Sequence, residues 1–166
     1  MTQKEIILQQ LAACHNETNW FATVQTALKD LTAEQASWHG IGAKHNIWEI
    51  AAHLIFWNER HLNRFKGASI EKWSGENNLT FKAGSPDKSE QEWKESVSKL
   101  DSILAELYEQ IKNADETKLQ GQAFEGSDDS WYAVLANIST HNAYHIGQIV
   151  TLRKEQGSWN PETGVK

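Results

Sequence analysis

The sequence is poor in the residues that cross-link or interrupt a chain. Its 166 residues include one cysteine and two prolines, so an internal disulfide is excluded and long uninterrupted helices are allowed. No apolar run approaches the roughly 18 residues that a membrane span requires. The N-terminus "MTQKEIILQQ" has no basic stretch followed by an apolar block, which argues against a signal peptide. These features predict a cytoplasmic protein without a membrane anchor.

Basic charge is also scarce. Sixteen lysines and arginines stand against 22 acidic residues, which gives a formal net charge of −6. Binding to nucleic-acid phosphates requires a basic surface, so nucleic acid is not expected as a partner. Tryptophan, in contrast, is plentiful, with eight residues. The length suits one domain with its own core, and we expect residues 1–166 to form a single domain.

Hydrophobic periodicity predicts long helices and no strand. The first helix is expected over about residues 4–30, with the polar stretch "HNETNW" able to bend or interrupt it. The second begins at Asn46, which can cap the helix while Glu49 lies three positions later at the positive end of its dipole. It should end near Gly67, a plausible C′ glycine.

The third and fourth helices complete the predicted bundle. Residues 68–84 lack a helical pattern, and the segment 85–87 is expected to restart a helix. Helical spacing then connects Trp93, Val97, Leu100, Leu104, Leu107 and Ile111. The fourth helix is predicted from about Ser130 to Gln156, ending at Gly157. We therefore expect an all-α, antiparallel four-helix bundle with a long crossover between the second and third helices.

Three histidines are candidate metal ligands. His141 and His145 stand one turn apart on the fourth helix, and His53 lies on the apolar stripe of the second. Three imidazoles can hold one ion and leave positions open, as in a catalytic site. The alternative is that each is a core histidine with a hydrogen-bond partner. Asn142 stands where a zincin would have Glu, and no Glu-x-x-His pattern occurs at these positions, so a mononuclear site is favoured.

The blocks "HNIWEIAAHLIFWNERHLNRFKG" and "HNAYHIGQIVTLRKEQGSW" resemble the DinB/YfiT-like superfamily of bacterial metal-binding helical bundles. The resemblance covers nearly the whole chain. It implies a four-helix bundle of up-down-down-up topology, often a homodimer. It also implies that His53, His141 and His145 bind a divalent transition metal, foremost Ni or Zn, with Fe, Mn and Co as further options.

The resemblance includes S-transferases that use low-molecular-weight thiols such as bacillithiol or mycothiol. A three-histidine ion with open positions can lower the pKa of a thiol or of water. The leading hypothesis is therefore metal-dependent thiol transfer or detoxification acting on a small molecule. A non-catalytic metal-binding stress-response protein and a metal-dependent hydrolase remain as alternatives.

Residues around the histidines have two readings each. Glu49 fits a helix cap better than a partner of a metal ligand. Gln148, one turn beyond His145, is either a hydrogen-bond partner that orients a ligand or an amide paired to a neighbouring helix. Trp57 and His61 lie on the same helix stripe as His53. Trp57 either lines the site or belongs to the core, and His61 either lines the site or is an amphipathic residue near the helix end. The segment 68–84 is either a cover for the metal site or a packed crossover.

Overall fold

The computed structural model describes residues 1–83 and 89–163, and this part of the chain is helical with no strand. An isolated bridge joins Gln122 and Ser130. The elements are α1 (Gln3–His15), α2 (Val24–Leu28), α3 (Ala33–Ser37), α4 (Ile47–Phe65), the 3₁₀ turn η1 (Asn77–Phe81), α5 (Glu90–Asn113), α6 (Glu116–Gln120), α7 (Trp131–Glu155) and the 3₁₀ turn η2 (Pro161–Thr163). The all-α prediction is confirmed. Among the described helices, none has the length and apolar character to cross a membrane.

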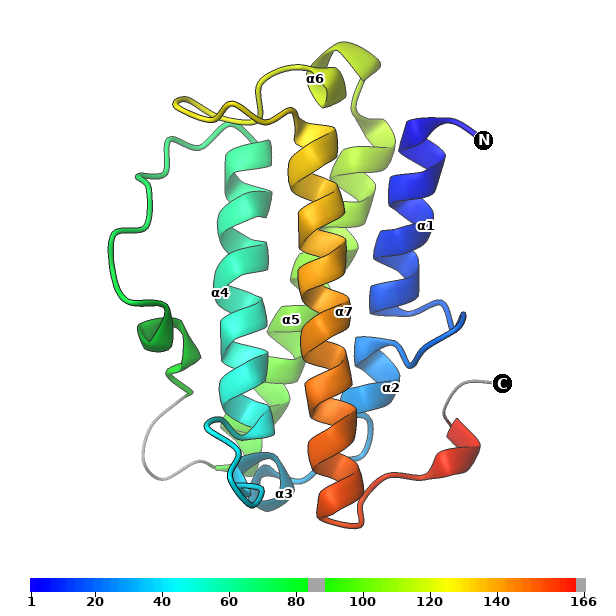
Figure 1. Cartoon of the computed structure of the whole chain (residues 1–166), viewed down its shortest axis with the longest axis vertical. Helices are drawn as coiled ribbons and strands as arrows, with labels where there is room; N and C mark the ends of the chain where they lie inside the picture. Colours follow the sequence, from blue (N-terminus) through cyan, green and yellow to red (C-terminus); the bar gives the residue numbers. More distant parts are fainter. Residues whose placement is uncertain (84–88, 164–166) are drawn as a thin grey trace.

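The long helices α1, α4, α5 and α7 lie side by side and form the bundle (Figure 1). Contacts run from α1 to α5, from α5 to α4, from α4 to α7 and from α7 back to α1. Apolar side chains fill the space between them in two clusters, one centred on Trp48 and Trp93 and the other on Phe65 and Trp131. The space between α4 and α7 also holds polar side chains, and these form the candidate site.

The segment expected to be helical over about residues 4–30 is interrupted, and the break begins within "HNETNW", the polar stretch marked as able to bend or interrupt it. α1 ends at His15 with Asn16 as its C-cap, and α2 begins only after Thr23, whose hydroxyl accepts a hydrogen bond from the Thr26 amide. Polar residues between the two helices satisfy the free backbone groups of helix ends. Apolar residues of both helices are nevertheless buried, so the stripe was real although the helix was not continuous.

The predicted ends of α4 are confirmed. Asn46 accepts from the Glu49 amide at 2.8 Å, and the Glu49 carboxylate accepts from the Asn46 amide at 2.9 Å. This reciprocal capping box satisfies two backbone donors and fixes the direction in which α4 starts. At the other end Gly67 has a φ of 93°, the left-handed conformation that glycine adopts without strain. Gly157 closes α7 in the same way, with a φ of 74°.

After α4 the described chain, up to residue 83, runs back along the outside of α4 (Figure 1). It contains η1, which packs against α4. The predicted helix start at residues 85–87 lies outside the described residues. The described part of α5 starts at Glu90, with the Ser89 hydroxyl accepting from the Glu92 amide. The connection before α7 contains the short helix α6, which the sequence pattern did not predict.

Candidate metal centre

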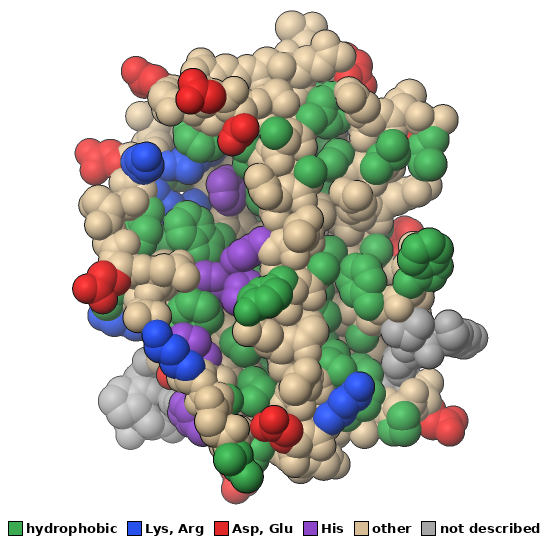
Figure 2. All heavy atoms as spheres, in the orientation of Figure 1, with side chains coloured by type: hydrophobic (Ala, Val, Ile, Leu, Met, Phe, Trp, Pro, Cys, Tyr) green, Lys and Arg blue, Asp and Glu red, His purple; other side chains and the backbone are tan. Residues whose placement is uncertain are grey.

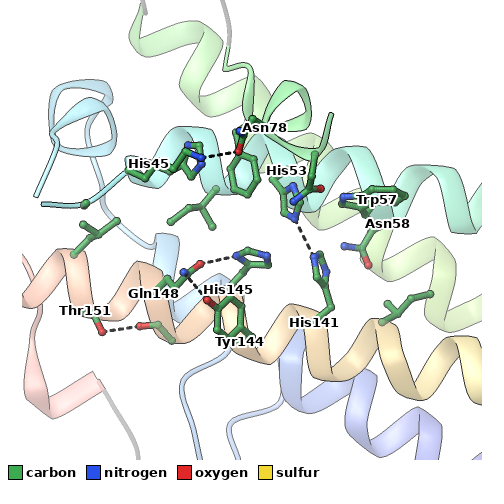
Figure 3. A pocket seen from close by; sticks show the side chains of 18 of the residues that line it. His45, His53, Trp57, Asn58, Asn78, His141, Tyr144, His145, Gln148 and Thr151 are labelled. Atoms are coloured by element: carbon green, nitrogen blue, oxygen red, sulfur yellow. Dashed lines mark hydrogen bonds between the residues drawn. The ribbon is translucent and has the colours of Figure 1, made fainter. Parts of the chain in front are cut away.

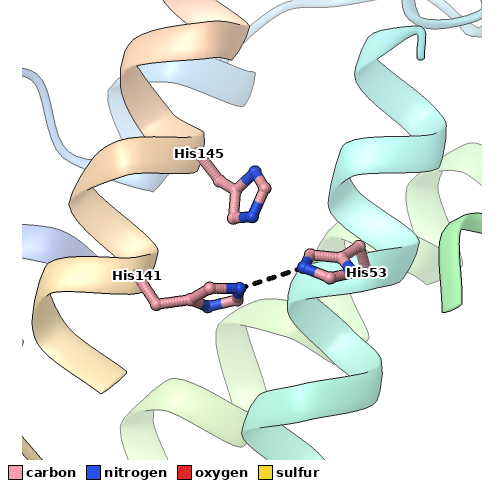
Figure 4. A group of neighbouring side chains, drawn as sticks. All are labelled: His53, His141 and His145. Carbon is pink, nitrogen blue, oxygen red and sulfur yellow. Dashed lines mark hydrogen bonds between the residues drawn. The ribbon is translucent and has the colours of Figure 1, made fainter. Parts of the chain in front are cut away.

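The three histidines that the sequence singles out lie close together between α4 and α7. His53 extends from α4, and His141 and His145 extend toward it from successive turns of α7 (Figure 4). One ring nitrogen from each lies within 4.8 Å of the other two. His53 and His145 are buried, with 2% and 6% of their surfaces exposed, and His141 is half-buried. Three imidazoles from two helices therefore converge and could hold one metal ion.

Hydrogen bonds around His53 determine which of its nitrogens is free. Its Nδ1 lies 2.6 Å from the Thr80 hydroxyl, and that hydroxyl donates to the Asn77 carbonyl, also at 2.6 Å. Because the Thr80 proton is already used, the Thr80 oxygen accepts the Nδ1–H of His53. Nε2 of His53 then carries the lone pair. An outer partner that fixes the tautomer in this way is typical of metal-binding histidines.

His145 is oriented by the same device. The Gln148 carbonyl Oε1 accepts from Nδ1 of His145 at 2.7 Å, and the Gln148 amide donates to the Tyr144 hydroxyl at 3.2 Å. The proton on His145 is therefore on Nδ1, and Nε2 carries the lone pair. Figure 3 shows Gln148 and Tyr144 beside His145. Of the two interpretations of Gln148, the structure shows the hydrogen bond to His145, a residue of the same helix.

His141 meets His53 directly, with 2.9 Å between their Nε2 atoms. Since Nε2 of His53 carries a lone pair, Nε2 of His141 donates the proton they share. Two donor atoms bound to one ion at about 2.0–2.1 Å each lie roughly 3 Å apart when they are neighbours. A divalent ion could therefore replace this proton with little movement of either ring. The donor set and its spacing fit a transition metal.

Burial keeps these imidazoles neutral. Desolvation, together with the neighbouring histidines, lowers the pKa of His53 to about 3 and that of His141 to about 4. Desolvation also lowers the pKa of His145, although the hydrogen bond to Gln148 opposes that shift. Burial disfavours the charged form, and a charge on one ring disfavours a charge on the next. At neutral pH no ring carries a second proton, and a metal would displace only the proton that His141 shares with His53.

Aromatic rings form one wall of the centre. Phe81, from η1, stacks on His53 with 3.9 Å between ring centroids and on His45 at the same distance. Trp57 stands edge-on to His53 at 6.4 Å. The connection after α4 therefore contributes Thr80 and Phe81 to the surroundings of His53. This turn packs against His53, with Thr80 on the Nδ1 side of the ring.

The histidines open into a pocket of about 1360 Å³ (Figure 3). In Figure 2 purple histidine side chains lie in a hollow bordered by green apolar side chains. Trp57 and His61 both line the pocket, together with Phe124 and Asp129 at the end near α6. This volume is somewhat larger than the roughly 300–1,000 Å³ that is typical of small-molecule sites, so a small molecule would fit.

Glu49 and Trp73 both lie outside the histidine cluster. Glu49 belongs to the capping box of α4, and its carboxylate also lies 3.6 Å from ring nitrogens of His39 and His45. The cap reading is confirmed. Trp73 packs against Phe56 on α4, with 4.9 Å between ring centroids, rather than over the histidines.

Sequence reasoning missed Thr80 and His45. Thr80 lies in a polar stretch without helical periodicity, and its contact with His53 spans 27 positions of the chain. His45 directly precedes the cap of α4, and it lines the pocket stacked on Phe81, a residue 36 positions later in the chain. The available signal was that Asn77 and Thr80 lie within the predicted crossover, residues 68–84. That signal does not show which side chain they contact.

Comparison with known families supports the same centre. The family model of the DinB superfamily matches residues 5–149. The chain belongs to the DinB superfamily. Comparisons with curated proteins and with solved structures returned no match. Membership of this superfamily and the three-histidine cluster together fit metal binding.

Proposed function

We propose that His53, His141 and His145 bind one divalent transition metal ion through their Nε2 atoms. The observation that carries this proposal is the fixed tautomer of His53 and His145, because each directs a lone pair into the cluster. Imidazole ligands suit several metals. Ni and Zn come first, followed by Fe, Mn and Co. Three protein ligands leave positions free for a small molecule, as in catalytic rather than structural sites.

We further propose that the metal-loaded protein transfers a low-molecular-weight thiol to an electrophile. When bound, the ion supplies Lewis acidity that lowers the pKa of a thiol. In the reaction the thiol proton goes to water, sulfur forms a bond to the electrophilic carbon, and the leaving group departs with the bonding electrons. Phe81 and Trp57 wall the cluster and limit the access of water to it, while Thr80 and Gln148 hold the rings in place.

The test combines metal content with turnover. Protein purified without a histidine tag should contain about one metal per chain and should consume an electrophile with at least one thiol from a panel of cysteine, glutathione and bacillithiol. His53→Ala should abolish both, whereas His39→Ala, which changes a half-exposed histidine outside the cluster, should preserve both. Metal-dependent ester hydrolysis without thiol transfer would instead favour a hydrolase. Metal binding without any turnover would favour a metal-binding stress-response protein.

Finer features of the chain are also proposed. We infer an up-down-down-up order for the bundle, supported by the connection that runs back along α4 (Figure 1). We also propose residues 1–166 as one domain of a cytoplasmic homodimer. An apolar groove on the outer side of α7, which includes Phe21, Ile146 and Val150, supports a dimer. Light scattering at two protein concentrations tests the dimer, and a mass of one chain at both would exclude it.

A further inference from the structure

Beyond Trp57, the second half of α4 carries a cluster of nitrogen donors. Arg60, His61 and Arg64 occupy its last turns, and both arginines act electrostatically on His61. Trp73, from the following connection, packs against Phe56, one turn before Arg60. Terminal nitrogens of Arg60 and Arg64 both donate to the Glu71 carbonyl. Arg60 also lies over the ring of Phe56, the ring that Trp73 contacts. The four side chains thus form one neighbourhood, which we call the arginine cluster (Arg60, His61, Arg64, Trp73).

Each member of the arginine cluster has a buried nitrogen that is not hydrogen-bonded. Among the described residues, no partner is found for Arg60 Nε, His61 Nδ1, Arg64 Nε or Trp73 Nε1. Three of these atoms are fixed N–H donors, since arginine and tryptophan side chains cannot accept. Leaving a buried donor unpaired is costly, and native proteins keep few of them. Four in one neighbourhood indicate a group that supplies acceptors.

The charges point to the kind of acceptor. The two guanidinium groups lie close enough that Arg60 lowers the pKa of Arg64, after the larger effect of burial. Within residues 1–83 and 89–163, neither forms an ion pair with a carboxylate. Two like charges held together in an acidic protein repel each other, and an anion between them relieves that repulsion. The planar fork of N–H donors on an arginine matches the geometry of carboxylate and phosphate oxygens.

The arginine cluster borders the pocket of the candidate metal centre. His61 lines the pocket, and Arg64 stacks over Phe124, another lining residue, at 4.2 Å from the ring centroid. Figure 2 shows blue side chains of Lys or Arg next to a histidine at the edge of the hollow. Asp129 lines the same end, but it is exposed, so water screens its charge. His61 follows His53 by two helical turns, or roughly 12 Å along α4.

We propose that the arginine cluster is the oxyanion subsite of the pocket and binds a carboxylate or phosphate group of the small-molecule substrate. A substrate with its reacting sulfur at the histidines then carries an anionic group about two helical turns away. This choice of substrate class rests on the proposed function. Binding of an oxyanion by the cluster does not, because none of its members is a proposed metal ligand.

Side-chain nitrogen NMR of the metal-free protein tests the subsite directly. The chain has three arginines, Arg60, Arg64 and Arg153, and Arg153 is an internal control because its guanidinium is bound to the carbonyls of Ala27 and Lys29. Addition of hexanoate should shift the Nε–H signals of Arg60 and Arg64 saturably, together with the indole N–H of Trp73. Hexanol at the same concentration should not. A parallel titration with inorganic phosphate shows which oxyanion is preferred.

Variants complete the test. Arg64→Gln should weaken hexanoate binding about tenfold, the effect expected for one charge-assisted hydrogen bond. Lys66→Gln makes the same charge change at an exposed position nearby and should change it less than about twofold. Trp73→Phe keeps an aromatic ring but removes the indole N–H, and gives a second variant if Arg64→Gln does not fold.

The absence of saturable shifts with both hexanoate and phosphate would overturn the subsite, as would equal shifts at Arg153 or with hexanol. A protein that binds hexanoate but retains no metal would preserve the subsite and refute the proposed function. The two ideas therefore fail independently.

Discussion

Two polar layers lie between α4 and α7, and they differ in what they leave open. In one layer Asn58 donates to Asn142 at 2.9 Å and Asn142 donates back at 3.0 Å. In the other, Nδ1 of His53 bonds to Thr80 and Nδ1 of His145 bonds to Gln148. Nε2 of His53 faces Nε2 of His141. Both layers are buried apart from His141, which is half-buried. The asparagine layer uses its donors and acceptors within the protein, whereas the histidine layer directs lone pairs to a common point.

Burial alone does not mark a functional site. The asparagine pair satisfies itself, as buried polar groups in a core must. The histidine layer is instead held from behind by Thr80 and Gln148 and remains incomplete in front. Such an arrangement suits a metal, whose ligands require fixed orientation and free lone pairs.

The largest expected effect is the loss of one ligand. His53→Ala should reduce metal affinity by more than about 100-fold, the upper range for loss of an outer partner of a ligand. Asn58→Ala in the other layer should leave affinity within about threefold. Competition with a chromogenic chelator measures both. Similar losses in the two variants would remove the distinction between the layers.

Loss of the Thr80 hydroxyl should have an intermediate effect. Thr80→Val keeps the shape of the side chain but removes the acceptor of the His53 Nδ1–H. Metal affinity should fall about 10–100-fold, as for other outer partners of metal-binding histidines. Thr140→Val, at an exposed position of α7 whose hydroxyl bonds only to the Ala136 carbonyl in the described structure, is the matched control. The assignment of the His53 tautomer is wrong if Thr80→Val retains full affinity.

Acid should destabilise the metal-free protein through the histidine layer. The pKa of His53 is lowered to about 3 and that of His141 to about 4, whereas in the unfolded chain both are about 6.5. Between these values the unfolded state binds more protons, so stability is complete above pH 6.5 and declines as the pH falls toward 4. Each histidine contributes a slope of up to about 1.4 kcal/mol per pH unit.

Chemical denaturation of the metal-free protein from pH 7.5 to 4.5 measures this slope. A variant with His53→Leu and His141→Leu should show a shallower decline, with some slope left because burial also lowers the pKa of His61 to about 4. An unchanged slope in the double variant would show that these rings are not held neutral by the fold.

The smallest effects are expected for stability in the asparagine layer. Asn142→Ala leaves the buried Oδ1 of Asn58 without its donor, although Asn58 still donates to the Leu54 carbonyl, and should cost about 1–3 kcal/mol of unfolding free energy. Replacing both residues by leucine removes the unpaired group and should recover most of that loss. Urea unfolding of the single and double variants measures the difference. A double variant less stable than Asn142→Ala would indicate a role beyond mutual pairing.

Sequence periodicity predicted the helices that pack along their whole length. The expected range of about Ser130 to Gln156 is close to the observed α7, Trp131–Glu155. Periodicity did not decide between a bend and a break near residue 16, where an apolar stripe continues across the polar stretch "HNETNW" and the caps of α1 and α2 show a break. A stripe reports which residues are buried, not whether the backbone between them is continuous.

The cluster itself was predictable because helical spacing fixes the face of His141 and His145, and His53 lies on an inward stripe. Its partners were not equally predictable. Gln148 is on the same helix as His145 and follows from helical geometry. Thr80 and Phe81 reach His53 from an irregular connection, so their positions depend on tertiary packing.

The most direct test of the metal centre is a crystal structure of the metal-loaded protein with anomalous scattering data. The account predicts one anomalous peak per chain between α4 and α7, with Nε2 of His53, His141 and His145 each about 2.0–2.1 Å from it. A peak bound through Nδ1 of His53 or His145, or located away from these three residues, would contradict it.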